Sequence, residues 1–144
     1  MSANVRLALL GANNKFLSAT TYDGISNVIA AVNDGIDSAS QYEVKADSAN
    51  RLALRAQDGS YLSVIGHSGG RMIVESGVKY DRNFDDWCWF DVVVYSAPNQ
   101  IALKANNGKY LSLILHSSGG PYVLQAQKNS IDNWSVFTVT TLFE

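Results

Sequence analysis

The sequence predicts an all-β fold made of three similar units, and three observations support this prediction. One pattern occurs three times: a branched aliphatic residue, Ala and Leu are followed, after six intervening residues, by an aromatic residue, Leu and Ser. Apolar residues around these segments alternate with a period of two, which is typical of strands with one buried face. Clusters of Gly, Asn, Asp and Ser recur roughly every 8 to 12 residues and leave little room for helices.

Each copy of the repeated segment is expected to form a β-hairpin. The three copies span residues 7–18, 51–63 and 101–112, so the repeat length is roughly 45 to 50 residues. The middle of each copy holds Asn13-Asn14, Asp58-Gly59 or Asn107-Gly108. These residue types tolerate positive φ, which predicts tight type I′ turns with positive φ at both central positions.

Two further strands complete each unit. The third strand is expected at residues 28–32, 72–74 and 122–126. The fourth is expected to begin at an aromatic residue, namely Tyr42, Trp87 or Trp134. The sequence therefore predicts twelve strands in one domain over residues 1–144, with repeats at roughly 5–48, 51–96 and 100–144.

Composition and charge exclude several classes of partner. The 144 residues are 47% hydrophobic and 17% charged, with a net charge of -2. This balance gives no electrostatic reason to bind nucleic acid or an anionic membrane, and no segment is long enough for membrane insertion. The single cysteine, Cys88, cannot form an internal disulfide, and the first residues lack the features of a signal peptide. We therefore expect a cytoplasmic protein.

The candidate ligand-binding residues lie in the polar loop after the second strand and in the turn after the third. His67 and His116 occupy equivalent loop positions, and Tyr22 lies near the third equivalent. Asn, Asp and His side chains can hydrogen-bond the hydroxyl groups of a sugar, and an aromatic ring can pack against its C–H face. Solvated loops and ordinary turn formation are the alternatives, and both stay open. The candidates are Tyr22, Asp23, Asn33, Asp37, His67, Ser68, Gly69, Gly70, Asn83, Asp85, His116, Ser117, Gly119, Asn129 and Asp132.

Catalytic and metal chemistry find little support in the sequence. The two histidines are roughly fifty residues apart and lack closely spaced partner ligands for zinc. No nucleophile elbow indicates a Ser-His-Asp hydrolase, and Cys88 between two tryptophans is expected to be a buried, inert thiol. We therefore expect a protein that is not an enzyme and that binds no metal and no cofactor.

The repeated Tyr-Leu-Ser after Asp-Gly or Asn-Gly, with an aromatic residue near each fourth strand, resembles the β-trefoil fold. The hairpin motif is similar to that of the trefoil units of fascin. The whole chain, with its His-Ser-Gly-Gly loops, resembles the β-trefoil lectins of mushroom fruiting bodies, those of boletes in particular. This resemblance implies a multivalent lectin for glycans ending in galactose or N-acetylgalactosamine, with up to three sites and a role in fungal defence. A homodimer is one possible assembly.

Two other functions remain alternatives. A trefoil protease inhibitor would use one protruding loop, for which residues 77–86 are the candidate. An intracellular protein-binding module like a fascin unit would instead present an exposed apolar or charged patch.

The chain differs from the ricin-type trefoil lectins, which have a Gln-x-Trp motif in each unit. The matching segments here are Gln41-Tyr42-Glu43, Asp86-Trp87-Cys88 and Asn133-Trp134-Ser135. The sugar contacts of that family therefore do not carry over.

Overall fold

The computed structural model describes residues 5–46, 51–78, 86–94, 99–116 and 118–143. Within these ranges the chain forms twelve β-strands and short 3-10 turns, and no α-helix. The expected all-β fold is therefore confirmed. No helix in the described ranges is long and apolar enough to cross a membrane.

The strands follow one another in three groups of four. The first group is β1 (Val5–Leu10), β2 (Phe16–Tyr22), β3 (Ile25–Asn33) and β4 (Tyr42–Ala46). The second is β5 (Arg51–Arg55), β6 (Tyr61–His67), β7 (Arg71–Val78) and β8 (Phe90–Val94). The third is β9 (Gln100–Lys104), β10 (Tyr110–Leu115), β11 (Tyr122–Lys128) and β12 (Phe137–Phe143).

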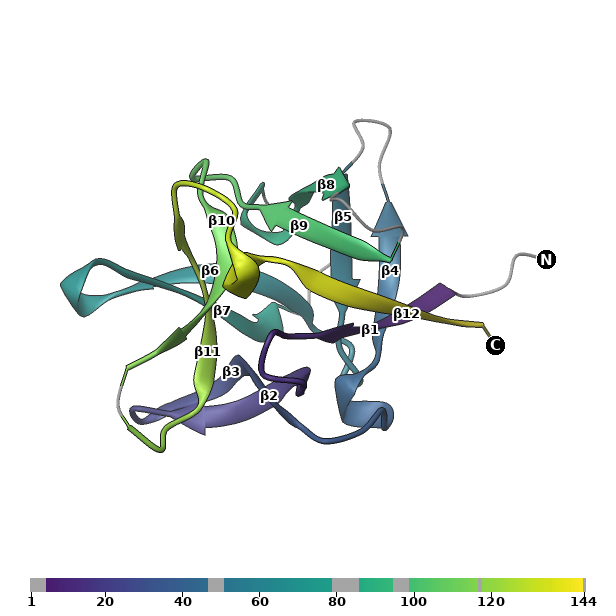
Figure 1. The fold of residues 1–144 in the computed structure, drawn as a ribbon, viewed down its shortest axis with the longest axis horizontal. Coiled ribbons are helices and arrows are strands. Elements are labelled where there is room, and N and C mark those ends of the chain that lie inside the picture. Colours follow the sequence, from purple (N-terminus) through teal and green to yellow (C-terminus); the bar gives the residue numbers. More distant parts are fainter. Residues whose placement is uncertain (1–4, 47–50, 79–85, 95–98, 117, 144) are drawn as a thin grey trace.

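The first and fourth strands of the groups form a closed ring. Antiparallel pairing joins β1 to β12, β12 to β9, β9 to β8, β8 to β5, β5 to β4 and β4 back to β1. The second and third strands form three hairpins, β2–β3, β6–β7 and β10–β11, which project from the ring (Figure 1). The third strands β3, β7 and β11 also pair with one another, which brings the three hairpins together.

Apolar side chains from all three groups fill the space inside the ring and under the hairpins. Tyr42, Phe90 and Phe137, the first residues of β4, β8 and β12, are at most 1% exposed. Where the three hairpins meet, Val28, Ile73 and Val123 form a second buried cluster. The same position of each repeat thus contributes to the same layer of the core, as a threefold body requires.

The hairpin turns differ from the type I′ turns that the sequence predicts. The amide of Gly59 donates to the carbonyl of Ala56 at 3.0 Å, and the amide of Ala56 donates to the carbonyl of Ser60 at 2.7 Å. Only the second residue of the predicted pair has positive φ, which is 87° at Gly59, 78° at Gly108 and 63° at Asn14. These bonds fit a three-residue loop, in which a type I turn precedes a bulge residue with positive φ. The prediction of a two-residue turn was wrong.

The start of the fourth strand was also misplaced in two repeats. Trp87 and Trp134 lie in the 3-10 turns η4 (Asp86–Cys88) and η5 (Asn133–Ser135), three residues before the strands begin at Phe90 and Phe137. The first repeat has the same arrangement, with η1 (Ser38–Ser40) before Tyr42. Trp87 and Trp134 therefore correspond in position to Ala39, and both pack on the outside of the core as partly buried side chains.

Candidate functional site at the hairpin tips

The tips of the three hairpins carry Tyr22, His67 and His116 at one equivalent position. Each lies five residues after the buried leucine of the repeated motif, namely Leu17, Leu62 or Leu111. Tyr22 and His67 are the last residues of β2 and β6, and His116 directly follows β10. The sequence-based equivalence of His67 and His116 therefore holds in the structure, and Tyr22, expected near the third equivalent position, occupies it.

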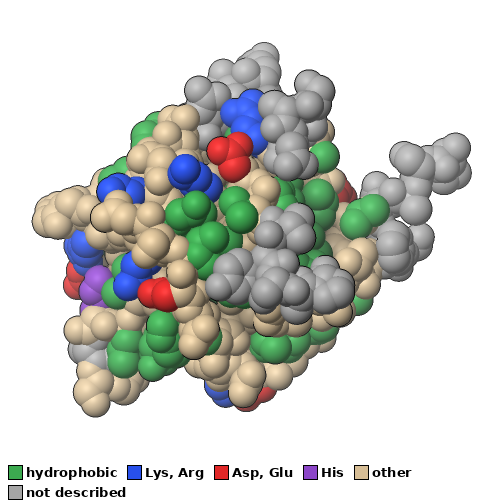
Figure 2. Space-filling view, turned by 45° about the horizontal axis from the view of Figure 1, so that its top comes forward, with side chains coloured by type: hydrophobic (Ala, Val, Ile, Leu, Met, Phe, Trp, Pro, Cys, Tyr) green, Lys and Arg blue, Asp and Glu red, His purple; other side chains and the backbone are tan. Residues whose placement is uncertain are grey.

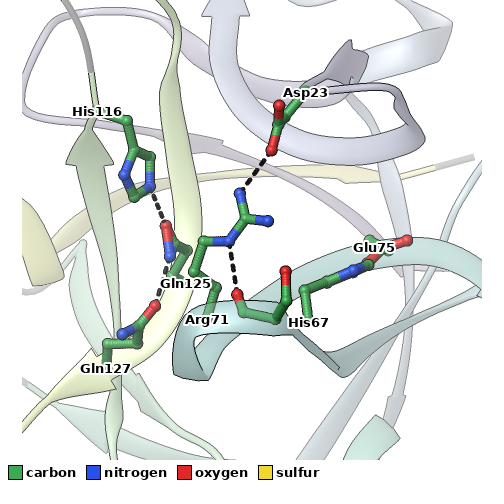
Figure 3. A network of polar contacts seen from close by, with 8 residues as sticks. Asp23, His67, Arg71, Glu75, His116, Gln125 and Gln127 are labelled. Atoms are coloured by element: carbon green, nitrogen blue, oxygen red, sulfur yellow. Dashed lines mark hydrogen bonds and ion pairs between the residues drawn. The ribbon is translucent and has the colours of Figure 1, made fainter.

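In two repeats the imidazole ring is held by a polar side chain of the neighbouring third strand. His67 Nε2 bonds Glu75 Oε2. His116 Nε2 bonds Gln125 Oε1 (Figure 3). Carboxylate and carboxamide oxygens accept hydrogen bonds, so each ring donates from Nε2. Glu75 is 7% and Gln125 0% exposed, which makes them supports for the rings rather than surface groups. The first repeat has Ala30 at this position, so it lacks the support.

The bonds of the third hairpin continue into the second. Gln125 Nε2 donates to Gln127 Oε1, and the same oxygen accepts from the backbone amide of Met72 at 3.3 Å. A directed chain of donors thus runs from His116 through Gln125 to Gln127 (Figure 3). Because Gln127 is exposed, this chain joins a buried carboxamide to groups that solvent or a ligand can reach.

The first hairpin contacts both of the others. Arg71 Nη1 lies 2.9 Å from Asp23 Oδ2, and Arg71 Nε donates to the carbonyl of Ser68 at 3.2 Å. The hydrogen bond to Asp23 raises the pKa of Arg71. Like any arginine, Arg71 is charged at all ordinary pH values. The ring of Tyr22 stacks on that of His116 with 5.5 Å between centroids and 27° between planes. Residues that are far apart in the sequence therefore share one surface.

Figure 2 shows histidine next to positive and negative side chains at the edge of the surface where the hairpins project. Asp23, Ser68 and His116 are exposed, and Tyr22 and Arg71 are half-buried. The loops that carry them are tight, because Gly69, Gly70 and Gly119 have positive φ of 78°, 77° and 79°. In the described part of the chain, no group of three or more His, Cys, Asp or Glu side chains could hold a metal ion.

The predicted turn residues lie elsewhere. Asp37 accepts from the amides of Ala39 and Ser40 at 3.0 and 3.1 Å and so caps η1. Asp132 caps η5 in the same way, with the amide of Trp134 at 2.9 Å. Both carboxylates thus complete a capping box, which is a turn-forming role.

The asparagines of these turns also have partners in the protein. Asn33 Nδ2 donates to Asp37 Oδ1 at 3.0 Å, and Asn129 Oδ1 accepts from Lys109 Nζ. Asn129 lies four residues beyond Gln125, which is about 13 Å along an extended strand. The structure therefore brings Tyr22, Asp23, His67, Ser68 and His116 together and keeps the turn residues apart from them. Asn83, Asp85, Ser117 and most of the loop 77–86 lie outside the described residues.

Four contributors were absent from the sequence prediction: Arg71, Glu75, Gln125 and Gln127. The sequence does contain one signal for Glu75 and Gln125, because both are polar residues at the same position of an otherwise apolar third strand. Nothing in the sequence predicts the contact between Arg71 and Asp23, because these residues are 48 positions apart and lie in different hairpins. Only the pairing of third strands brings those two loops together.

Comparison with solved structures identifies the architecture as a β-trefoil. The chain matches ThreeFoil, a designed threefold-symmetric protein, with a TM-score of 0.74, 16% identity and coverage of 93% of this chain and 96% of that one. It matches the BEL β-trefoil in an apo crystal form with a TM-score of 0.71, 12% identity and coverage of 96% and 93%.

A third match is a Polyporus squamosus lectin bound to the epitope Neu5Acα2-6Galβ1-4GlcNAc. Here the TM-score is 0.69 and the identity 16%, with 96% of this chain covering 49% of that one. The chain therefore spans about half of that lectin. A scan of family models and a search of curated proteins found no match. Together the structural matches confirm the expected fold.

Proposed function

We propose that the protein is a carbohydrate-binding protein whose sugar site is formed by the hairpin tips. The observation that carries this proposal is the stack of Tyr22 on His116 next to the ion pair of Asp23 with Arg71. A sugar presents an apolar C–H face and several hydroxyl groups that both donate and accept. The ring of Tyr22 suits the first, and Asp23 and His116 suit the second.

The buried side chains of Glu75 and Gln125 favour binding of a sugar that makes only a few contacts. Gln125 and Glu75 hold the two imidazole rings, so little side-chain entropy is lost when a hydroxyl group binds. A shallow site that is already ordered can bind a sugar with few contacts.

The specificity we propose is for glycans that end in galactose or N-acetylgalactosamine. The similarity to a lectin bound to a glycan epitope supports carbohydrate binding in general, and the resemblance to mushroom β-trefoil lectins suggests this class of sugar. The two histidine positions, at His67 and His116, support more than one site per molecule, and linked weak sites gain avidity on a glycan-coated surface. We further propose a role in the defence of a fungus against animals that feed on it. In this proposal the protein is located in the cytoplasm and is not an enzyme.

Calorimetry with lactose and N-acetylgalactosamine tests the site. His116→Ala removes one polar partner and the ring that stacks on Tyr22, and we expect a loss of about 1 to 3 kcal/mol at that site, or roughly 5- to 150-fold in affinity. His67→Ala is expected to affect a second site, which would lower the stoichiometry instead.

The matched control is Asn129→Ala, which removes an exposed polar group at the other end of the same hairpin. Its affinity should equal that of the parent. Equal losses in His116→Ala and Asn129→Ala would contradict a site confined to the tips. Parental binding in His67→Ala,His116→Ala, with the fold intact, would remove the tips from the site altogether.

A further inference from the structure

A hollow lies at the seam between the first and second repeats. It has a volume of about 310 Å³, and sites for small molecules range from about 300 to 1,000 Å³. In the described part of the chain, its walls come from the hairpin β2–β3, the 3-10 turn η1, the β5–β6 turn and β7. Three of the lining residues are alanines, namely Ala19, Ala39 and Ala56, and Asn27 and Gln57 add carboxamides. Small side chains therefore leave this place open.

The pseudo-threefold symmetry identifies the same place at the seam between the third and first repeats. The third strands cross both seams in the same register, since Val28 pairs with Glu75 at one and Val123 with Ala30 at the other. Corresponding residues are set by their spacing from the motif leucine, from the valine of the central cluster and from the aromatic residue that begins the fourth strand. They are Ala19 and Leu113, Asn27 and Tyr122, and Ala39 and Trp134.

Large side chains fill this place in the third repeat. The rings of Tyr122 and Trp134 are stacked, with 4.6 Å between centroids and 8° between planes, and both pack against the core. Leu113 is buried and reaches the turn of the first repeat, where a Cβ atom added to Gly11 would collide with its Cδ1. Two flat rings and a leucine thus occupy the seam.

The first repeat lacks these side chains. Its Ala19, Asn27 and Ala39 are all exposed. In the second repeat the positions of Asn27 and Ala39 are held by Met72 and Trp87, which pack against the core. The hollow is therefore specific to the first repeat, and it corresponds to the space that a stacked pair of rings takes up in the third.

The two turns that border the hollow are fixed by hydrogen bonds of their own. Asp37 accepts from the amide of Ala39 at 3.0 Å and so caps η1. In the β5–β6 turn the amide of Ala56 donates to the carbonyl of Ser60 at 2.7 Å, and Asp58 accepts from the amide of Ser60 at 2.9 Å. The backbone around the hollow is thus ordered before a ligand binds, which lowers the entropic cost of binding.

We propose that this hollow binds the planar ring of a small aromatic molecule of the phenol or indole class; this goes beyond the proposed carbohydrate binding and does not depend on it. A flat ring that lies on Ala19 and Ala39 would bury apolar surface, as the stacked rings do in the third repeat. The carboxamides of Asn27 and Gln57 both donate and accept, so they suit a hydroxyl or N–H group at the edge of such a ring.

Titration of the isotope-labelled protein with phenol and with indole, followed by amide chemical shifts, tests the proposal. We expect shifts at Ala19, Asn27 and Ala39, and none at Leu113 in the filled seam. Cyclohexanol carries the same hydroxyl group as phenol on a ring of similar size that is not planar. Its binding should be at least tenfold weaker than that of phenol.

Two variants give the first repeat the side chains of the third. Ala39→Trp and Ala19→Leu each place a large group in the hollow, and each should weaken binding of both probes at least tenfold. Both alanines are exposed, so the fold should tolerate either change. Ala12→Trp is the matched control, because it adds the same indole ring at an exposed alanine that does not line the hollow. Its affinity for the probes should equal that of the parent.

Lactose is titrated in parallel with the parent and Ala39→Trp, and equal lactose binding by both would keep the hollow distinct from the hairpin tips. Absence of binding of both aromatic probes would overturn the proposal. It would also be overturned by equal binding of cyclohexanol and phenol, or by parental affinity in folded Ala39→Trp and Ala19→Leu. Equal losses of probe affinity in Ala12→Trp and Ala39→Trp would place the probes outside the hollow.

Discussion

Gly108 offers the sharpest test of the hairpin geometry, because its φ of 78° is a conformation that L-residues rarely adopt. A Cβ atom added there would meet no atom within 4 Å, so the cost of a substitution comes from the backbone alone. A β-branched residue resists this conformation most, and Gly108→Val should destabilise by about 1 to 3 kcal/mol. Asn14 has φ of 63° at the equivalent position of the first repeat. Gly108→Asn should therefore cost much less than Gly108→Val.

Denaturant unfolding of the parent, Gly108→Asn and Gly108→Val measures the difference directly. The midpoint should fall in that order with an unchanged slope, and thermal midpoints should fall by about 2 to 4 °C per kcal/mol. Equal stability of the Val and Asn variants would refute the left-handed conformation at this turn. Equal stability of Gly59→Val and the parent would refute it for the second repeat, where φ is 87°.

Three further predictions concern Tyr42, Asp132 and metal independence. Burial raises the pKa of the Tyr42 hydroxyl in the folded protein. Its contribution to folding stability is therefore complete below about pH 10, the ordinary pKa of tyrosine, and is lost at higher pH, because the unfolded chain then releases the proton more readily than the folded protein does. Tyr42→Phe should abolish that part of the alkaline loss of stability and cost about 1 kcal/mol near pH 7 for the bond to the Leu17 carbonyl. Asp132→Ala removes the cap of η5 and should cost about 0.5 to 2 kcal/mol, with sugar affinity unchanged. Incubation with a chelator should leave sugar binding unchanged in calorimetry, and a loss would contradict a metal-independent site.

The fold was largely predictable because the three repeats carry the same local signals. The Leu-Ala-Leu and aromatic-Leu-Ser segments place the buried strands, and the pairs such as Asp58-Gly59 place the turns. The error at the fourth strand came from giving weight to Trp87 and Trp134 as large aromatic residues. The signal that was overlooked is the capping pattern of Asp followed by Ser three residues later, as at Asp132 and Ser135. The tryptophan lies in the 3-10 turn, and the Phe three residues later, Phe90 or Phe137, is the residue buried in the core.

The candidate site was predictable only in part. The equivalence of His67 and His116, with Tyr22 near the third position, follows from the sequence, and the structure places all three at the hairpin tips. The assembly of the tips into one polar surface does not follow, because it depends on how three separate hairpins pack around a common axis. The pairing of Val28 with Glu75 across two repeats illustrates this, since neither residue carries any local sign of the other.

Binding of the parent protein to an array of glycans, with a panel of proteases assayed beside it, tests the central claim most directly. We predict binding to glycans with terminal galactose or N-acetylgalactosamine and no inhibition of any protease. His116→Ala should bind those glycans more weakly, while Asn129→Ala should match the parent. Absence of binding to every glycan, or inhibition of a protease by the parent without glycan binding, would contradict the claim that this β-trefoil is a carbohydrate-binding protein.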